Sequence, residues 1–160
     1  MKRALVLLLL LSVYFSGKAQ QPAGVVPDFN FFKLDGTSFT NKNLEQGKKI
    51  FFVFFDPGCD HCQHAMNDIS IHHNELNKVA LYLISVDIKE RINNFLATYG
   101  KNLRSKKNVI VLQDLKNEFI QKFKPRKYPS MFLYSSEKKL LLYDDNEKNL
   151  ASFLKKINHK

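Results

Sequence analysis

Six consecutive apolar residues, Ile50 to Phe55, constrain the fold of this chain more than any other segment. A strand with one face in water alternates apolar and polar residues, and this run does not alternate. We therefore expect a strand at the centre of a sheet that helices cover on both faces. The run ends at Asp56-Pro57-Gly58, a turn sequence that also sets up the next element.

The rest of the chain alternates strand-like and helix-like segments. Apolar residues recur at helical spacing from Cys59 to about Lys78 and from Glu90 to Tyr99, with a second buried strand at 79–86 between them. The other expected elements are strands at 29–34, 37–40, 109–112, 131–134 and 140–143, and helices at 115–123 and 150–157. Helical crossovers join parallel strands, so this order predicts a one-domain α/β sandwich whose mixed central sheet is flanked by helices on both faces.

The N-terminus has the three parts of a secretory signal peptide: Lys2-Arg3, an apolar run at 4–15, and small residues ending at Ala19. The run is shorter than the roughly 20 residues that span a bilayer, which favours cleavage over a retained anchor. We expect a signal peptide at 1–19, an extended leader at 20–27 and the folded domain at 28–160. This organisation predicts an exported protein in a bacterial periplasm, with secreted or signal-anchored forms as alternatives.

The charge of the chain is strongly positive, with 25 Lys and Arg residues against 15 Asp and Glu residues and a formal charge of +10. The cations form short scattered clusters at 106–107, 122–127 and 155–156, which is typical of a solvated surface. An exported protein rarely meets nucleic acid, so we expect no nucleic-acid partner.

Cys59 and Cys62 are the two cysteines of the sequence and are separated by two residues. A structural zinc site needs four ligands, and the chain has no second CxxC. A static disulfide around so short a loop would add little stability. A pair that cycles between dithiol and disulfide fits better, because the helix N-terminus expected there favours a thiolate on Cys59. Cys62, one turn further and more buried, would then resolve the mixed disulfide.

These residues together resemble the thioredoxin-like thiol–disulfide oxidoreductases, specifically the exported TlpA/ResA-like branch. The resemblance covers nearly all of residues 25–157. It is carried by Pro27-Asp28-Phe29, Leu34-Asp35-Gly36, the strand 50–55 with Cys59-Asp60-His61-Cys62, Ile84-Ser85-Val86-Asp87 and Tyr128-Pro129-Ser130. The resemblance implies a thioredoxin-like sandwich and a redox-active CxxC.

Several site residues follow from this resemblance. Pro129 matches a proline that is cis in the family, which would leave the Tyr128 backbone free to pair with an extended substrate. His61, if protonated, would stabilise the thiolate, while Asp60 would oppose it. Gly58 replaces the usual aromatic residue before the first cysteine, so we expect a more open rim for the substrate. Asp87 is expected to cap the turn that follows it.

One feature of the family is missing from this sequence. Relatives carry a carboxylate that takes the proton from the resolving thiol, but the two matching positions hold Val53 and Ala65. His61, His64 or Asp56 could replace it, and the sequence does not choose among them.

The function that the resemblance implies is exchange of the Cys59–Cys62 disulfide with cysteines of exported client proteins, with reduction favoured over oxidation. We expect a monomer that uses no cofactor or metal and meets a membrane or periplasmic electron donor or acceptor. One alternative is a Cu/Zn-binding module for metal delivery that uses the two cysteines and His64, with His72 and His73 too far along the same helix. Another is a thiol peroxidase-like protein, although those enzymes carry a hydroxyl residue where Asp56 stands.

Overall fold

The non-alternating apolar strand lies at the centre of a seven-stranded sheet. The computed structural model describes residues 21–159, so the expected signal peptide at 1–19 lies outside the described residues. The strand order is β2-β1-β5-β4-β3-β6-β7. β3 (Lys49–Phe54) lies between β4 (Val79–Ser85) and β6 (Ser130–Tyr134), and every residue of β4 and β6 is buried.

The sheet is mixed, as the order of elements predicted. β3, β4 and β5 (Val109–Gln113) run parallel to one another. β6 is antiparallel to β3, β7 (Leu140–Asp144) is antiparallel to β6, and β1 (Asn30–Lys33) is antiparallel to both β2 (Ser38–Thr40) and β5. Parallel strands end at the same edge, so β3, β4 and β5 bring the loops after Phe54, Ser85 and Gln113 together.

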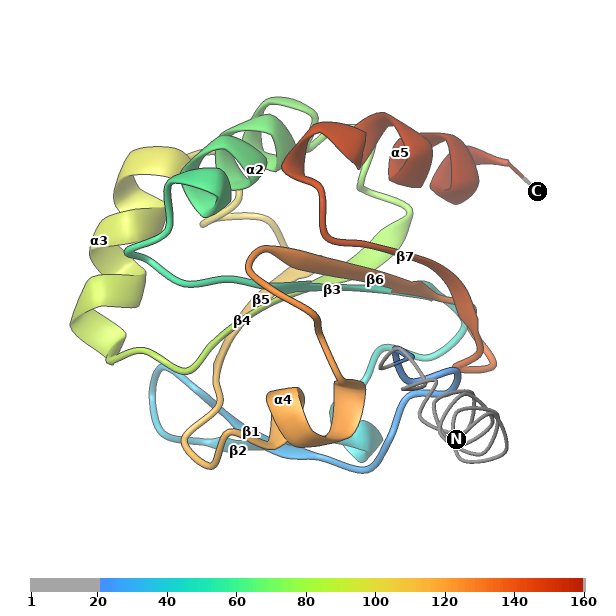
Figure 1. The fold of residues 1–160 in the computed structure, drawn as a ribbon, viewed down its shortest axis with the longest axis horizontal. Coiled ribbons are helices and arrows are strands. Elements are labelled where there is room, and N and C mark those ends of the chain that lie inside the picture. Colours follow the sequence, from blue (N-terminus) through green and yellow to red (C-terminus); the bar gives the residue numbers. More distant parts are fainter. Residues whose placement is uncertain (1–20, 160) are drawn as a thin grey trace, which may run out of the picture.

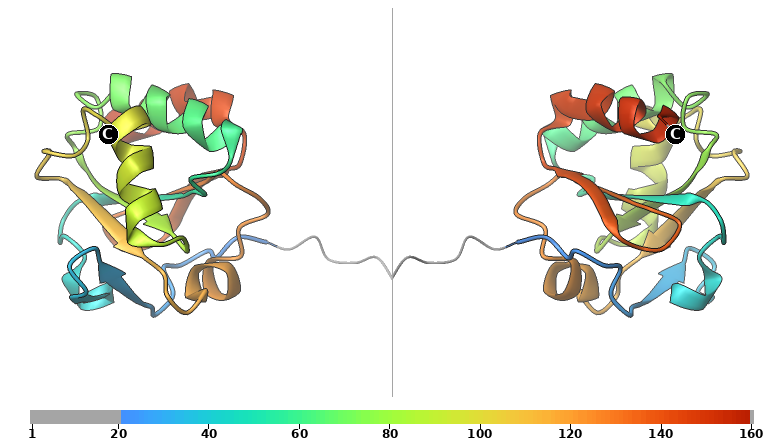
Figure 2. Two further views of the ribbon diagram at one scale, coloured as in Figure 1. Left: turned by 90° about the vertical axis from the view of Figure 1, so that its left-hand side faces the viewer. Right: turned by 90° about the vertical axis from the view of Figure 1, so that its right-hand side faces the viewer.

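Helices cover both faces of the sheet (Figure 1). On one face lie α2 (Asp60–Ile71), α3 (Lys89–Tyr99) and α5 (Leu150–Asn158), which begins directly after the short 3-10 helix η2 (Glu147–Asn149). Figure 2 shows α4 (Glu118–Phe123) and the 3-10 helix η1 (Asn41–Asn43) on the opposite face. Among the described residues no helix is both long and apolar enough to cross a bilayer.

The core beneath α4 is built mainly from aromatic rings. Phe119 stacks on Phe54 with ring centroids 4.5 Å apart and on Phe123 at 4.2 Å. All three rings are buried, so α4 is held to the sheet through phenylalanine contacts. The run at 50–55 therefore belongs to the core, as expected from its pattern.

Residues 23–26, within the segment expected as a leader, run along the β6–β7 hairpin. Val26 donates its N–H to the Lys138 carbonyl at 3.0 Å, and Gly24 accepts the Leu140 N–H at 2.8 Å. The Val26 side chain is buried, so this part of the leader packs onto the domain.

The helix that carries the cysteines is shorter than predicted. It ends at Ile71, where the His72 N–H bonds to the Asp68 carbonyl, and the prediction that it reaches about Lys78 is wrong. Residues 72–78 form turns instead, for example from the Glu75 N–H to the His72 carbonyl at 3.0 Å. The buried side chain of Leu76 continues the apolar period from a turn, which is why periodicity alone overextended the helix.

Candidate active site

A hydrogen-bonded turn positions the cysteine pair at the end of β3. The Asp56 carbonyl accepts the Cys59 N–H at 3.1 Å, and the Asp56 carboxylate accepts the Gly58 N–H at 2.6 Å. Cys59 is the N-cap of α2, and its carbonyl accepts the Cys62 N–H at 3.0 Å and the Gln63 N–H at 3.2 Å. Cys59 therefore lies at the positive end of the helix dipole, where an anion is stabilised.

The two thiols lie in different environments. Cys59 is partly exposed, whereas Cys62 is fully buried. Burial raises the pKa of the Cys62 thiol, and the neighbouring Cys59 raises it further. The Asp56 N–H donates to the Cys62 sulfur at 3.5 Å. This hydrogen bond lowers the pKa of the Cys62 thiol, but by less than burial raises it. A reactant in solvent can thus reach Cys59, while Cys62 is held protonated behind it.

The loop before β6 faces the accessible thiol. The Tyr128–Pro129 peptide bond is cis, which confirms that expectation. The Cys59 thiol donates to the Tyr128 carbonyl at 3.9 Å, while the Tyr128 N–H donates to no acceptor within residues 21–159. Burial raises the pKa of Tyr128 to about 12, and its ring lies 4.7 Å from that of Phe54. Tyr128 and Pro129 are therefore brought beside Cys59, with a main-chain donor still unused.

His61 contacts an acidic residue that sequence reasoning missed. Its Nδ1 lies 3.1 Å from Glu147 Oε1, across 86 residues of sequence. The backbone N–H of Glu147 lowers the pKa of its own carboxyl, and His61 lowers it further. No local pattern in the sequence marks Glu147, because it reaches His61 only once η2 packs beside α2.

The structure distinguishes the three candidates for the missing proton acceptor. Val53 and Ala65 are buried and apolar, so neither can take up a proton. His61 faces Glu147, and His64 is exposed on α2. Asp56 is the candidate that touches Cys62, through its N–H, and its charge also acts on that thiol.

The space beside Gly58 is bordered by a guanidinium group. A Cβ atom at Gly58 would lie 3.1 Å from Arg91 Nη2 and 3.3 Å from Asp56 Oδ1. Arg91 is held on its other side by Asp87, with Nε 3.3 Å from Oδ2. Asp87 also accepts the Ile88 N–H at 2.7 Å, although the N-cap of α3 is Ile88 and receives no side-chain hydrogen bond.

A metal site was one alternative for this region. Within residues 21–159 no group of three or more His, Cys, Asp or Glu side chains could hold a metal ion. His72 and His73 follow the end of α2, where each ring Nδ1 lies 2.9 Å from a helix carbonyl, those of Asp68 and Ser70.

Comparisons with known proteins agree with this fold. The profile of the AhpC/TSA family matches residues 22–143, whereas a comparison with curated proteins found no match. A secreted disulfide oxidoreductase from Mycobacterium tuberculosis, homologous to E. coli DsbE, is 18% identical with a TM-score of 0.66, covering 80% of this chain and 95% of that one. A thioredoxin-like protein from Aeropyrum pernix is 15% identical with a TM-score of 0.66, covering 81% and 89%.

A peroxidoxin, BcpB from Mycobacterium tuberculosis, is also similar in structure. It is 14% identical with a TM-score of 0.69, and the similarity covers 88% of this chain and 100% of that one. At these identities the similarity concerns the fold, and it confirms the expected thioredoxin-like sandwich.

Proposed function

The chain belongs to the AhpC/TSA family, and on that premise we propose that it is a thiol–disulfide oxidoreductase whose Cys59–Cys62 pair alternates between dithiol and disulfide. One observation carries the proposal: a partly exposed and a fully buried thiol lie one turn apart at a helix N-terminus. A nucleophilic thiol must be accessible to its client, while the resolving thiol must lie within reach of the mixed disulfide formed there. Cys59 meets the first requirement and Cys62 the second.

The reaction proceeds in two exchange steps. The Cys59 thiolate attacks one sulfur of a client disulfide, which forms a Cys59–client bond and releases the other client sulfur as a thiolate. Cys62 then loses its proton and attacks the Cys59 sulfur, which forms the Cys59–Cys62 disulfide and releases the second client thiolate. The client gains two electrons and the cysteine pair loses them. An external dithiol returns the pair to its reduced form.

Asp56 is our candidate for the proton acceptor in the second step. Its N–H contacts the Cys62 sulfur at 3.5 Å, and its negative charge raises the pKa of that thiol. In this scheme the Asp56 carboxylate, whose charge acts on Cys62, replaces the buried acid missing at Val53 and Ala65. In the same scheme His61 favours the Cys59 thiolate, with Glu147 holding its ring.

Export, a periplasmic location, the TlpA/ResA-like branch and the reducing direction belong to the same proposal. The signal-like sequence at 1–19 supports export, and one structural neighbour is described as secreted. Client proteins with accessible cysteines and a membrane or periplasmic electron donor are the partners that this scheme requires.

Trapping of a mixed disulfide tests the proposal. Cys62→Ser should accumulate a covalent complex between Cys59 and a disulfide-bonded peptide, because the resolving step is lost. Cys59→Ser is the matched control and should form none. Absence of any complex with Cys62→Ser at excess peptide disulfide would refute the proposed function.

The direction of electron flow requires the equilibrium potential of the pair against glutathione. A value near −270 mV would support a reductase, and one near −120 mV an oxidase. The sequence contains no Trp, so the two redox states are best separated by alkylation and gel shift.

A thiol peroxidase is the second candidate, and the similarity to a peroxidoxin favours it. In that reaction peroxide would oxidise Cys59 to a sulfenic acid, and Cys62 would condense with it, releasing water. The position three residues before Cys59 holds Asp56, whose carboxylate accepts the Gly58 N–H and offers no hydroxyl to the peroxide. Dithiol-dependent consumption of hydrogen peroxide, compared with reduction of a peptide disulfide, separates the two activities.

A further inference from the structure

A small hollow opens beside the loop that faces Cys59. Its volume is about 160 Å³. The residues that line it are Phe54, Ile120, Pro125, Arg126, Lys127 and Tyr128. Tyr128 connects the hollow to the cysteine pair, because its carbonyl accepts the Cys59 thiol at 3.9 Å. A molecule bound at Cys59 would therefore meet this hollow with its neighbouring groups.

The floor of the hollow is apolar. The Phe54 side chain is buried, the Tyr128 ring lies 4.7 Å from the Phe54 ring, and Pro125 also lines the hollow. Ile120 on α4 is 41% exposed. A ligand side chain in the hollow would bury part of this apolar surface, which is favourable. The volume is below the 300 Å³ or more that is typical of small-molecule pockets and is of the order of a single large side chain.

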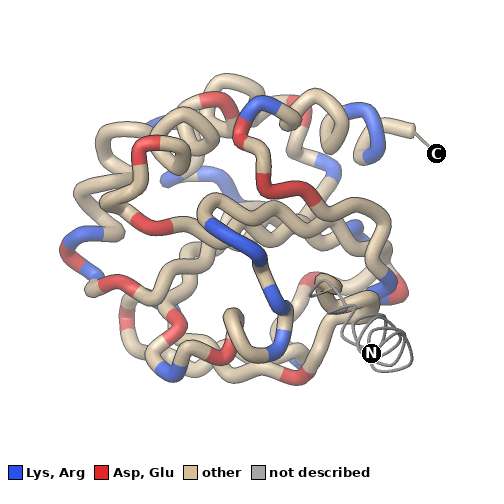
Figure 3. The backbone as a smooth tube through the Cα atoms, viewed as in Figure 1, with Lys and Arg blue, Asp and Glu red and all other residues tan. Residues whose placement is uncertain are grey.

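The rim of the hollow carries an uncompensated positive charge. The side chains of Arg126 and Lys127 are 55% and 61% exposed and share one carboxylate, Asp145. Arg126 Nε lies 2.7 Å from Asp145 Oδ2, whereas Lys127 Nζ is 3.9 Å from Oδ1. Figure 3 shows this basic loop next to the acidic residues that follow β7. Lys127 is the more loosely paired and the more exposed of the two cations, so it is the one that a ligand can engage.

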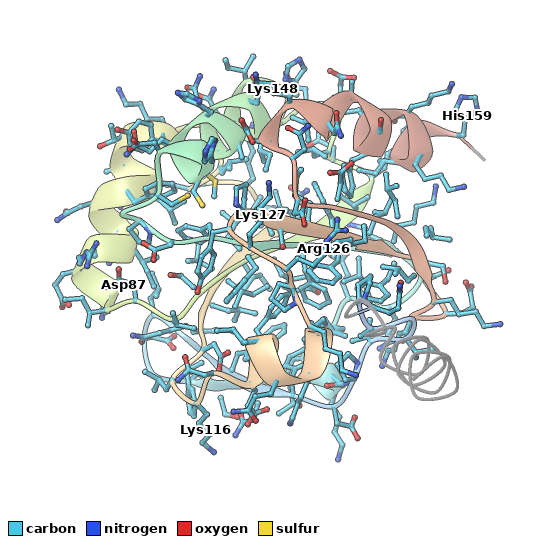
Figure 4. The ribbon with its side chains drawn as sticks, viewed as in Figure 1. Asp87, Lys116, Arg126, Lys127, Lys148 and His159 are labelled. Atoms are coloured by element: carbon cyan, nitrogen blue, oxygen red, sulfur yellow. The ribbon has the colours of Figure 1, made fainter. Side chains whose placement is uncertain are left out.

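The Gly58 side of Cys59 carries carboxylates. Asp56 and Arg91 border the space beside Gly58, and Asp87 pairs with Arg91. In Figure 4, Asp87 marks the start of α3 on this side, while Arg126 and Lys127 mark the loop before β6.

We propose that the hollow beside Tyr128 docks an extended segment of a polypeptide client, with an apolar residue next to the reacting cysteine and an acidic residue just beyond it. This inference rests on the proposed function and specifies its substrate class. The segment's backbone pairs with the free Tyr128 N–H, its apolar side chain fills the hollow, and its carboxylate meets Lys127. The carboxylates on the other side of Cys59 disfavour the same acidic residue there.

Reduction of short peptide disulfides tests the inference. In the first pair of peptides, Leu precedes the cysteine and is itself preceded by Asp in one peptide and by Lys in the other. In the second pair, Leu follows the cysteine and is itself followed by Asp or by Lys. A fifth peptide has only neutral flanks. The bound segment has one direction, so only one side of the cysteine brings the charged residue to Lys127. For the peptide pair with the charge on that side, we expect kcat/KM to be about fivefold higher with Asp than with Lys. A fivefold preference is the size expected when an exposed Lys127 attracts the Asp carboxylate of one peptide and repels the Lys ammonium of the other.

Charge reversal at the rim provides the decisive variant. Lys127→Glu should reverse the Asp-over-Lys preference, measured as the ratio of kcat/KM for the two charged peptides. Lys101→Glu, an exposed cation that follows α3 at its far end, is the matched control and should keep the preference. About 0.5 M salt should reduce the preference in the unmodified protein, since both charges are exposed.

The outcomes separate the inference from the function on which it rests. If the neutral peptide is reduced but Asp and Lys peptides react equally in both placements, the docking proposal is overturned and the oxidoreductase remains. If the neutral peptide is not reduced either, the proposed function fails. A preference that survives Lys127→Glu would also overturn the assignment to this hollow.

Discussion

Alkaline pH should destabilise the dithiol form of this protein through one buried group, the Cys62 thiol. The side chain is fully buried, and burial raises its pKa above the ordinary value of 9.0. In the unfolded chain the thiol ionises near that value, whereas in the folded protein it stays protonated. Its contribution to stability is therefore complete below about pH 9 and is lost as the pH rises toward the folded pKa.

The magnitude follows from the unfolded state alone. At pH 10, one unit above the unfolded pKa of 9.0, ionisation stabilises the unfolded chain by RT ln(1 + 10), or about 1.4 kcal/mol. At pH 7.5 the same expression is close to zero. Each further pH unit adds about 1.4 kcal/mol while the folded thiol remains protonated.

Urea unfolding with excess reductant at pH 7.5, 9 and 10 measures this effect, with Cys62→Ala as the comparison. The variant loses a buried sulfur and is less stable than the unmodified protein at pH 7.5, by about 1–2 kcal/mol. The difference in free energy of unfolding between the unmodified protein and Cys62→Ala should be about 1.4 kcal/mol smaller at pH 10 than at pH 7.5, because the variant has no thiol at position 62 to ionise. Burial also raises the pKa of Tyr82 and Tyr134, but both proteins share these groups and their effect cancels. A gap that stays constant from pH 7.5 to 10 would refute the burial argument for Cys62.

Three further predictions concern reactivity and stability. Iodoacetamide should modify Cys59 of the reduced protein at least tenfold faster than Cys62, because only Cys59 is partly exposed; equal rates by mass spectrometry would contradict this asymmetry. Phe119→Ala should lower the free energy of unfolding by about 3–5 kcal/mol, since the ring is fully buried, and a urea midpoint near that of the unmodified protein would oppose it. Asp114→Ala should cost about 1–3 kcal/mol, because the buried carboxylate accepts the Glu118 and Phe119 N–H groups at 3.0 and 2.7 Å; loss of less than 0.5 kcal/mol would argue against that capping role.

The position of the cysteine pair was predictable because it depends on local pattern. An apolar run without alternation predicts a central strand, and the turn and helical period after it predict a helix N-terminus at Cys59. The cis Tyr128–Pro129 bond was expected from the resemblance to a family and is present. The end of α2 was not predictable, because Leu76 keeps the apolar period from within a turn.

The surroundings of the pair could not be read from the chain. Glu147 meets His61 across 86 residues, and Asp145 meets Arg126 across 19. The sequence shows only that Gly58 has no side chain. The structure shows that the Arg91 guanidinium borders the space beside Gly58, because α3 packs against α2.

The amino-acid order by itself determined the order of strands and helices and the place of the cysteine pair after the central strand. Periodicity and turn residues act over a few positions, so these features are written locally. Only the tertiary structure decided which charges surround Cys59, which residue touches Cys62 and that a hollow opens beside Tyr128. Those contacts depend on how strands and helices from distant parts of the chain are brought to one edge of the sheet, and no short-range pattern encodes that arrangement.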